Sequence, residues 1–491
     1  MATLNATSKG RMKTTNKSGH AAYKLDIKTK LMTMALTTML GEPKFYGDNT
    51  DELIKTAEAL CKSGEGEFVA KLAVWARTKG NLRSVSHALM AVVARNCGGE
   101  QFIRPAVRII ASQRGDDGTE MIAAFLSLYG KPLNHALLRG VRDALEAEKP
   151  YAVAKYQSGS KVVKLRDTLR LTHPCAESHL TAEAMGKCID GTLPFPKSWE
   201  TELSARGNTK EVWDELIAER KVPFMAALRN LRNMLNVGAD VDPILDMLSD
   251  RDAVARSRQL PFRFFSAYRE LLSAGLASTK VTRTLDMALA HACRNADKLP
   301  GRTAVLIDTS GSMGGRISSK STVSCRDIAA VLGAMVARIS DDAMVLGFDG
   351  DARIIPMMGM SVLSDVNMVP HSGGWTNMDA GFDALSNSGF DADRVIVLSD
   401  YEVNGSWRGQ KKTVQWKMGG YRNKVGHDVW CHAIDLQGYG TQQFIGPKTN
   451  IMAGWSDSVL RFIALTEKGT GSLIEEVDSL TLVPGDSNAG D

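Results

Sequence analysis

The sequence predicts a multidomain protein in which an all-α, HEAT-like helical-repeat array precedes an α/β, doubly wound domain. Between residues 25 and 298, apolar residues recur at helical spacing in short segments that are separated by Gly, Pro, Asn and Asp. From residue 299 the pattern changes to short, nearly continuous apolar runs that alternate with helical segments. Such an alternation is typical of a parallel sheet covered on both faces. The length of 491 residues is sufficient for about three domains.

The first part of the chain contains an N-terminal arm and then a helical module. Residues 1–24 are rich in Lys, Thr, Ser, Gly and Asn and have little to bury, so we expect a flexible basic arm. Over residues 25–298 strand-like alternation is absent, and no short helix could bury its apolar face alone. Stacked helices are therefore favoured, without a strict sequence period. The clearest helical segments are Leu53–Cys61, Phe68–Arg77, Val85–Arg95, Met121–Leu128, Leu133–Leu145, Val212–Arg220, Phe224–Leu235 and Val281–Arg294.

The second part, residues 299–476, is predicted to form the α/β domain, and residues 477–491 a C-terminal tail. Expected strands are Thr303–Ile307, Met344–Phe348, Arg394–Leu398, Val429–Ile434 and, more weakly, Asn450–Ala453. Expected helices are Cys325–Ile339, Met378–Leu385 and Ser458–Thr466. Ligands of such sheets bind at the carboxyl ends of the strands, which is where we look for chemistry.

Charge and composition narrow the class of protein. The net charge of +5 combines 44 basic and 33 acidic residues up to residue 300 with 16 basic and 22 acidic residues after it. This split favours a polyanion partner for the first part and a cation site in the second, although moderate asymmetry is also common in multidomain proteins. No apolar run is long enough for a membrane span, no secretory signal is recognisable, and the seven cysteines form no CxxC pair. We therefore expect a reduced, cytoplasmic protein without a membrane partner.

A candidate cation site follows the first predicted strand. The D-x-S-x-S sequence of Asp308, Ser310 and Ser312 places a carboxylate and two hydroxyls at alternate positions, Thr376 follows a Gly-Gly-Trp turn, and Asp400 ends a later strand. Hard oxygen donors of this kind suit Mg²⁺, or else Mn²⁺. The alternative is a simple helix cap, but a cap needs one such residue rather than five. The phosphate-loop motif and a base beside the carboxylates are both missing, which favours a binding site over an enzyme.

This arrangement resembles the metal-ion-dependent adhesion site of the von Willebrand factor A domain, which has a Rossmann-like fold. The resemblance implies that Ser310 and Ser312 bind one divalent cation directly, and that Thr376, Asp308 and Asp400 bind it directly or through water. It also implies a coordination position left for an acidic ligand.

The densest cationic segment is Lys155–His173, with Asp167 as its single acid. If Ser160–Leu171 is a helix, Arg166 and Arg170 are neighbours on one face and could follow RNA phosphates. The alternative is an ordinary solvated helix face. The basic candidates of this segment, with its terminal histidine, are Lys155, Lys161, Lys164, Arg166, Arg170 and His173.

A helical array followed by an A domain resembles the Ro 60 kDa autoantigen family with its TROVE module, in a bacterial or phage-type form. Lys155-Tyr156 followed by Leu169–Pro174 is similar to the family's K-Y…L-R-L-[ST]-H stretch, and Pro223–Leu231 is similar to its P-[MF]-x-A-L-L-R-N-L helix. Leu260–Arg263 is similar to its H-P-F loop, with Leu in place of His.

The Ro resemblance implies that the helices close into a ring. It also implies that small structured RNA of the Y class binds the ring's outer surface and that single-stranded 3′ ends of misfolded RNA enter its hole. At the matching positions the resemblance implies that Lys155, Arg170 and His173 contact RNA, with Arg229 and Arg232 as weaker candidates. Arg83 and His87 either line the ring or pack inside it.

These observations lead to a non-catalytic RNA-binding protein, expected to be monomeric. It would act in RNA quality control or as a scaffold that presents RNA to a 3′-to-5′ exoribonuclease. The alternative is a metal-dependent adaptor whose A domain binds carboxylates of a protein partner through its metal ion.

Overall fold

A computed structural model describes most of the chain in two compact units. The helical unit comprises Ile27–Lys197 and Leu473–Asp491, and the sheet unit comprises Met1–Asp26 and Ser198–Ser472. The described residues are 13–15, 21–24, 26–37, 48–80, 82–157, 162–259, 261–294, 298–316, 323–371, 373–402, 414–437, 441–453, 458–467 and 473–482.

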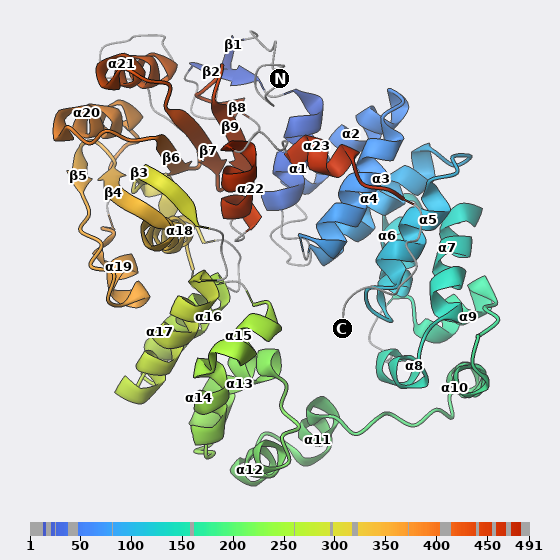
Figure 1. The fold of residues 1–491 in the computed structure, drawn as a ribbon. Helices are drawn as coiled ribbons and strands as arrows, with labels where there is room; N and C mark the ends of the chain where they lie inside the picture. The colour runs from blue at the N-terminus through green and yellow to red at the C-terminus, as the bar shows by residue number, and fades with distance from the viewer. Residues whose placement is uncertain are drawn as a thin grey trace. The chain divides into compact units, whose positions relative to one another are not determined.

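The helical unit is a succession of short helices packed on their neighbours (Figure 1). They are α1 (Ile27–Thr37), α2 (Asp48–Lys62), α3 (Gly66–Thr78), α4 (Arg83–Asn96), α5 (Ile103–Ala111), α6 (Asp117–Tyr129), α7 (His135–Glu146), α8 (Pro150–Tyr156), α9 (Leu165–Thr172), α10 (His179–Asp190) and α23 (Leu473–Asp478). The predicted helices of this region are all present, with ends within a few residues of the expected ones.

The pair α5 and α7 illustrates why these helices stack. Ile103, Val107 and Ile110 form a buried stripe along α5 at helical spacing. Gly140 of α7 allows close approach, because a Cβ there would lie 2.6 Å from the carbonyl oxygen of Arg104. Apolar contact between neighbouring helices, rather than propensity alone, therefore stabilises these short helices.

The C-terminal helix α23 packs within the helical unit, against α1 and α3. Lys79 Nζ lies 2.9 Å from Oε1 of Glu476, and the indole of Trp75 donates a hydrogen bond of 3.2 Å to the same oxygen. The sequence boundary between an A domain and a tail at residue 476 falls inside this helix. Its two buried apolar residues, Leu473 and Val477, are too few to give a recognisable periodic signal.

The sheet unit begins with further short helices and continues into the α/β domain. Its first helices are α11 (Trp199–Arg206), α12 (Lys210–Ala218), α13 (Phe224–Asn236), α14 (Asp242–Ser249), α15 (Arg251–Ser257), α16 (Pro261–Ser273) and α17 (Thr279–Cys293). The last two pack on helices of the α/β domain, and Asp286 of α17 accepts a 2.9 Å hydrogen bond from the amide of Leu363. The compact unit thus includes helices on both sides of the change in sequence pattern at residue 298.

The α/β domain is built on a six-stranded sheet of order β5-β4-β3-β6-β7-β9, in which all pairs are parallel except β5 with β4. The strands are β3 (Leu299–Asp308), β4 (Ser340–Phe348), β5 (Ala352–Ile354), β6 (Arg394–Ser399), β7 (Trp430–Asp435) and β9 (Thr449–Ala453). The helices are α18 (Cys325–Ile339), α19 (Val362–Met368), α20 (Met378–Ser388), α21 (Gln415–Val425) and α22 (Ser458–Glu467). All five predicted strands and all three predicted helices are present.

Helices cover both faces of the sheet, with α18 on one side and α20 and α21 on the other (Figure 1). Gly333 of α18 lies over β3, where an added Cβ would come 2.7 Å from Cδ1 of Ile307. On the opposite face, Gly381 of α20 lies against Leu306 and Phe348, both 3.2 Å from an added Cβ. The β3 strand is therefore buried on both sides, which explains its continuous apolar sequence.

Part of the predicted basic arm forms strands. The strands β1 (Lys13–Thr15) and β2 (Ala21–Lys24) pair with each other, and β2 pairs with β8 (Thr441–Gln442), all antiparallel. Backbone hydrogen bonds hold this small sheet, so the polar side chains of the arm gave no sign of it. Among the described helices none has the length and apolar character needed to cross a membrane.

Candidate cation site and nucleic-acid interface

The D-x-S-x-S segment lies at the carboxyl end of β3, where a turn of 3₁₀ helix (Gly311–Gly314) begins. Asp308 is fully buried. Its Oδ1 accepts a hydrogen bond of 2.9 Å from the amide of Ser310, and its Oδ2 accepts one of 2.6 Å from the hydroxyl of Ser399. The carboxylate is therefore fixed at the sheet edge by its own loop and by the neighbouring strand β6.

The two serines and the threonine predicted as ligands lie in adjoining loops. The hydroxyl oxygens of Ser310 and Ser312 are 3.1 Å apart, and Ser312 is exposed. The amide of Gly311 donates a 3.0 Å hydrogen bond to the carbonyl of Gly374, which joins this loop to the turn that carries Thr376. The hydroxyl-bearing segments predicted from the sequence are thus brought to one edge of the sheet.

Asp400 follows β6 and completes the candidate set. It is 1% exposed, its carboxylate accepts a 3.2 Å hydrogen bond from the amide of Glu402, and it is hydrogen-bonded to the side chain of Ser312. Burial, and then the negative charge of Asp400, raise the pKa of Asp308 to about 7. Burial likewise raises the pKa of Asp400. When both are ionised, the buried carboxylates of Asp308 and Asp400 therefore repel each other at this edge.

The donors at this edge fit a hard divalent cation. Within the described ranges, no group of three or more His, Cys, Asp or Glu side chains is arranged for a metal ion. A cation here would therefore be held by the two carboxylates together with the hydroxyls of Ser310, Ser312 and Thr376. Oxygen ligands with low total charge suit Mg²⁺, which usually keeps several waters.

Sequence reasoning missed three other polar residues of this edge. Ser399 holds Asp308, Asp349 follows β4 and is hydrogen-bonded by Arg353 at 2.8 Å, and Asp435 ends β7. Each comes directly at or after the end of an apolar strand, and that position was the signal that could have found them. The two aspartates bring further acidic character to the same edge.

The cationic candidates of the helical unit lie on α8 and α9. The second of these helices begins at Leu165, five residues later than expected, and Lys164 precedes it. Lys161 and its neighbours 158–160 lie outside the described residues. Arg166 and Arg170 are both exposed and four residues apart on α9, as predicted. His173 is exposed just after the last helical residue, with a left-handed φ of 47°.

Most of these charges have no acidic partner within the part of the chain that the structure describes. Arg166 lies 3.9 Å from Asp167, a weak contact at an exposed position, and Arg170 donates to the carbonyl of Ile189 at 3.2 Å. The Lys155 ammonium lies 5.7 Å from the centre of the Tyr156 ring, and Arg114, which the sequence analysis did not single out, stacks on the same ring at 5.1 Å.

The arginine candidates of α13 differ from each other. Arg232 forms a 3.0 Å ion pair with Glu270, so its charge is already compensated. Arg229 is exposed, and its charge, together with burial as the larger cause, lowers the pKa of Arg263. Arg263 lies in the first turn of α16, so Pro261–Arg263 of the segment compared with the H-P-F loop are helical, while Leu260 lies outside the described residues. Arg263 is therefore an added candidate beside Arg229.

Arg83 and His87 pack inside the helical unit, which is the second of the two roles considered for them. The guanidinium of Arg83 contacts Asp116 at 2.6 Å and Asp117 at 2.7 Å, and His87 Nε2 lies 3.2 Å from Asp117. His87 is 4% exposed. These residues form a buried ion-pair network between α4 and the start of α6.

Comparisons with known proteins agree with the architecture. Residues 182–310 match the TROVE domain. The chain is 48% identical over 82 residues to telomerase protein component 1 of Rattus norvegicus, covering 16% of this chain and 3% of the relative. It is 26% identical over 248 residues to RNA-binding protein RO60 of Caenorhabditis elegans, covering 47% of this chain and 38% of the relative. The chain thus spans well under half the length of these relatives.

A solved structure shows the same fold. The crystal structure of the Deinococcus radiodurans RO (RSR) protein superposes with a TM-score of 0.63 and 17% identity, covering 91% of this chain and 100% of that one. The resemblance to the Ro 60 kDa family and the predicted fold class, helical repeats followed by a von Willebrand factor A-like domain, are confirmed.

Proposed function

We propose that this chain is an RNA-binding protein without catalytic activity. The observation that carries the proposal is the α8–α9 surface, which we define as Lys155, Lys164, Arg166, Arg170 and His173. Arg166 and Arg170 present two guanidinium groups from adjacent turns of one exposed face, and their ion pairing within the described residues is limited to the weak 3.9 Å contact of Arg166 with Asp167. A row of unpaired cations on a helix is suited to successive phosphates of a nucleic acid strand.

The contacts around Tyr156 define one end of the α8–α9 surface. Its hydroxyl accepts a 3.2 Å hydrogen bond from Arg114 Nε, and Lys155 and Arg114 both lie near its ring. Arg114 also pairs with Asp116 at 3.1 Å, which holds the guanidinium against the ring. Lys155 therefore has a fixed aromatic support, whereas the charge of Arg114 is compensated by Asp116.

The resemblance to the Ro 60 kDa family supports a narrower proposal for the cargo. The RNA would be small, structured and Y-like, and single-stranded 3′ ends of misfolded RNA would be a second ligand near Arg229 and Arg263. The protein would act as a monomer in the cytoplasm and present RNA to a 3′-to-5′ exoribonuclease.

The proposal is tested by RNA affinity. We expect a structured small RNA to bind in fluorescence anisotropy, and Arg166→Glu with Arg170→Glu to weaken that binding at least tenfold. Lys62→Glu is the matched control, because Lys62 is an exposed cation of α2 in the same unit and its variant should bind like the wild type. Equal affinity of all three proteins would refute the role of the α8–α9 surface.

A second candidate function rests on the edge of the sheet. Asp308 and Asp400 are buried while Ser312 is exposed, so a cation held by them would be open to solvent on one side. When bound, Mg²⁺ would supply a position for a carboxylate or phosphate oxygen of a partner. We propose that this site takes an acidic ligand, as in a metal-dependent adaptor.

The two functions separate in one experiment. A ligand of the cation site should bind only with Mg²⁺ and should be lost in Asp400→Asn, whereas RNA binding by the α8–α9 surface should persist in that variant. Loss of RNA binding in Asp400→Asn would contradict the assignment of RNA to the helical unit.

A further inference from the structure

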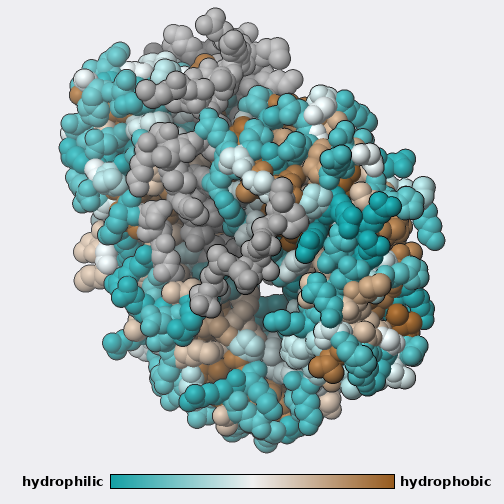
Figure 2. All heavy atoms as spheres, turned by 45° about the vertical axis from the view of Figure 1, so that its right-hand side comes forward, coloured by the Kyte–Doolittle hydropathy of each residue, from teal (hydrophilic) through white to brown (hydrophobic). Residues whose placement is uncertain are grey.

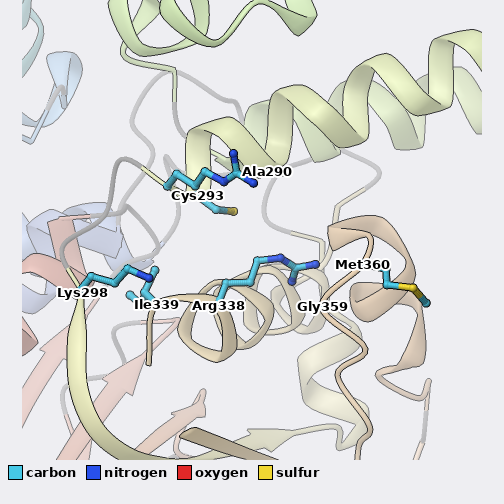
Figure 3. Close-up of a pocket in the computed structure, with 8 residues that line it drawn as sticks. Ala290, Cys293, Lys298, Arg338, Ile339, Gly359 and Met360 are labelled. Carbon is cyan, nitrogen blue, oxygen red and sulfur yellow. The ribbon is translucent and has the colours of Figure 1, made fainter. Parts of the chain in front are cut away.

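The sheet unit contains a pocket that neither proposed function uses. Its volume is about 430 Å³, and it lies where the end of α17, the end of α18 and the loop after β5 come together (Figure 3). The lining residues are Ala290, Cys293, Arg294, Lys298, Arg338, Ile339, Gly359 and Met360. This size is within the range of small-molecule sites, roughly 300–1,000 Å³.

The charges of the pocket wall are of one sign. Arg294, Lys298 and Arg338 contribute three cations, and no carboxylate is among the lining residues. Arg294 and Lys298 are exposed, and neither has an ion-pair partner within the described ranges. Because Asp365 compensates only Arg338, an anion is the complementary ligand.

Arg338 has an unused donor at this pocket. Its Nη1 lies 2.7 Å from Asp365 and donates to the carbonyl of Ala334 at 3.2 Å. Its Nη2 is shielded from solvent and has no hydrogen-bond partner in the part of the chain that the structure describes. A buried N–H without an acceptor is unfavourable, so a ligand oxygen that accepts from Nη2 would remove that cost.

The remaining wall is apolar and uncharged. Ala290, Ile339 and Met360 line it, and burial raises the pKa of the Cys293 thiol to about 12, so that it stays protonated at neutral pH. Figure 3 shows the Cys293 sulfur directed toward Arg338 across the pocket, with Lys298 at one end and Met360 at the other. The exposed thioether of Met360 can adjust to a flat ring.

We propose that this pocket binds a phosphomonoester on an aromatic body, the chemistry of a nucleoside 5′-monophosphate. The phosphate would lie among Arg294, Lys298 and Arg338, and the base would extend toward Met360 at the other end of the pocket (Figure 3). The group could come from a free nucleotide or from the 5′ end of an RNA. The competing explanation is that the cations only complement the negative ends of α17 and α18.

The test uses the full-length protein and isothermal titration with uridine 5′-monophosphate and adenosine 5′-monophosphate, with uridine and adenosine as uncharged probes. We expect both nucleotides to bind at least tenfold more tightly than their nucleosides. Arg294→Glu with Lys298→Glu should abolish this difference. Arg283→Glu changes an exposed residue of α17 outside the pocket and should leave it intact. No binding, or equal binding by all three proteins, would overturn the proposal in favour of helix-end compensation.

A second comparison identifies the source of the phosphate. A short RNA with a 5′-phosphate should bind better than its 5′-hydroxyl form if the pocket accepts RNA ends, and equally well if it accepts only free nucleotide. If the free nucleotide binds, either result is consistent with phosphomonoester binding by the pocket, and the comparison only identifies the source of the phosphate. RNA affinity of the α8–α9 surface is measured separately with the Arg166 and Arg170 variants, so failure of one proposal leaves the other unaffected.

Discussion

Replacing Asp400 by Asn should have opposite effects on stability in the absence and in the presence of magnesium. Asp308 and Asp400 are both buried, and the charge of Asp400 raises the pKa of Asp308, so each ionised carboxylate disfavours the other. The asparagine keeps an oxygen that can accept from the amide of Glu402. Without a cation, the substitution therefore removes repulsion at little cost in hydrogen bonding.

The size of the effect follows from the Asp308 carboxyl. Its pKa rises from 3.8 to about 7, with burial as the larger cause and the charge of Asp400 as the second, and each pKa unit that Asp400 causes corresponds to about 1.4 kcal/mol. In EDTA at pH 8, Asp400→Asn should thus raise the melting temperature by about 3–5 °C. Magnesium at 100 times its dissociation constant should stabilise the wild type by about 2.7 kcal/mol and the variant hardly at all.

Differential scanning fluorimetry in EDTA and over a magnesium titration measures both effects. Asp349→Asn is the matched control, because Asp349 ends the neighbouring strand but is paired with Arg353 at 2.8 Å. It should lower stability in EDTA and keep the magnesium response. A wild type that magnesium does not stabilise, combined with a destabilised Asp400→Asn protein, would show that the carboxylates serve an internal hydrogen-bond network instead.

Three further predictions concern RNA binding, packing and pH. Arg166→Ala with Arg170→Ala should lower the slope of log K against log salt by about 1.4–1.8, so that between 50 and 200 mM salt the wild type loses about 7- to 12-fold more affinity than the variant; an unchanged slope would contradict phosphate contact. Gly333→Ala should cost about 1–2 kcal/mol in urea unfolding, because its Cβ would lie 2.7 Å from Cδ1 of Ile307, and Ile307→Val should relieve most of that cost in a double-mutant cycle. Burial lowers the pKa of His432 from 6.5, so below about pH 6.5 the unfolded chain binds a proton that the folded chain does not. The free energy of unfolding should therefore fall as the pH is lowered from about 6.5 to about 5. In the His432→Gln variant the free energy of unfolding should depend less on pH over this range.

Periodic segments of the sequence predicted the structure well. The apolar run Arg394–Leu398 is buried at every residue of β6, and the helix predicted at Cys325–Ile339 has those bounds. In both cases the apolar residues of one short segment are sufficient to show which of its faces are buried. By contrast, α9 begins at Leu165 rather than Ser160, because the carboxylate of Asp167 accepts from the amide of Lys164 and ends the preceding coil there.

Features that depend on residues far apart in the sequence could not be predicted from local sequence patterns. The pairing of β2 with β8 joins residues more than 400 positions apart through backbone groups, which leave no mark on side-chain pattern. The ion pair of Arg232 with Glu270 on another helix could likewise not be predicted from local sequence, and it compensates the charge of Arg232. Motif spacing found Asp308 and Asp400, whereas Asp349 and Asp435 are marked only by their positions at the ends of apolar strands, and their proximity to Asp308 and Asp400 depends on the strand order.

The topology of the sheet explains why acidic side chains gather at this edge. Across β4, β3, β6 and β7, the strand ends carry Asp349, Asp308, Asp400 and Asp435 in that order. The first of these is neutralised by a guanidinium, but Asp308 and Asp400 have no basic partner within the described ranges. A site needing only hydrogen bonds could use one carboxylate and one amide. Two adjacent buried acids without a basic side chain need a neutralising partner, which is either a proton or a bound cation. The neighbouring hydroxyls of Ser310 and Ser312 add further oxygen donors, and together with the charge balance they favour a cation at this edge.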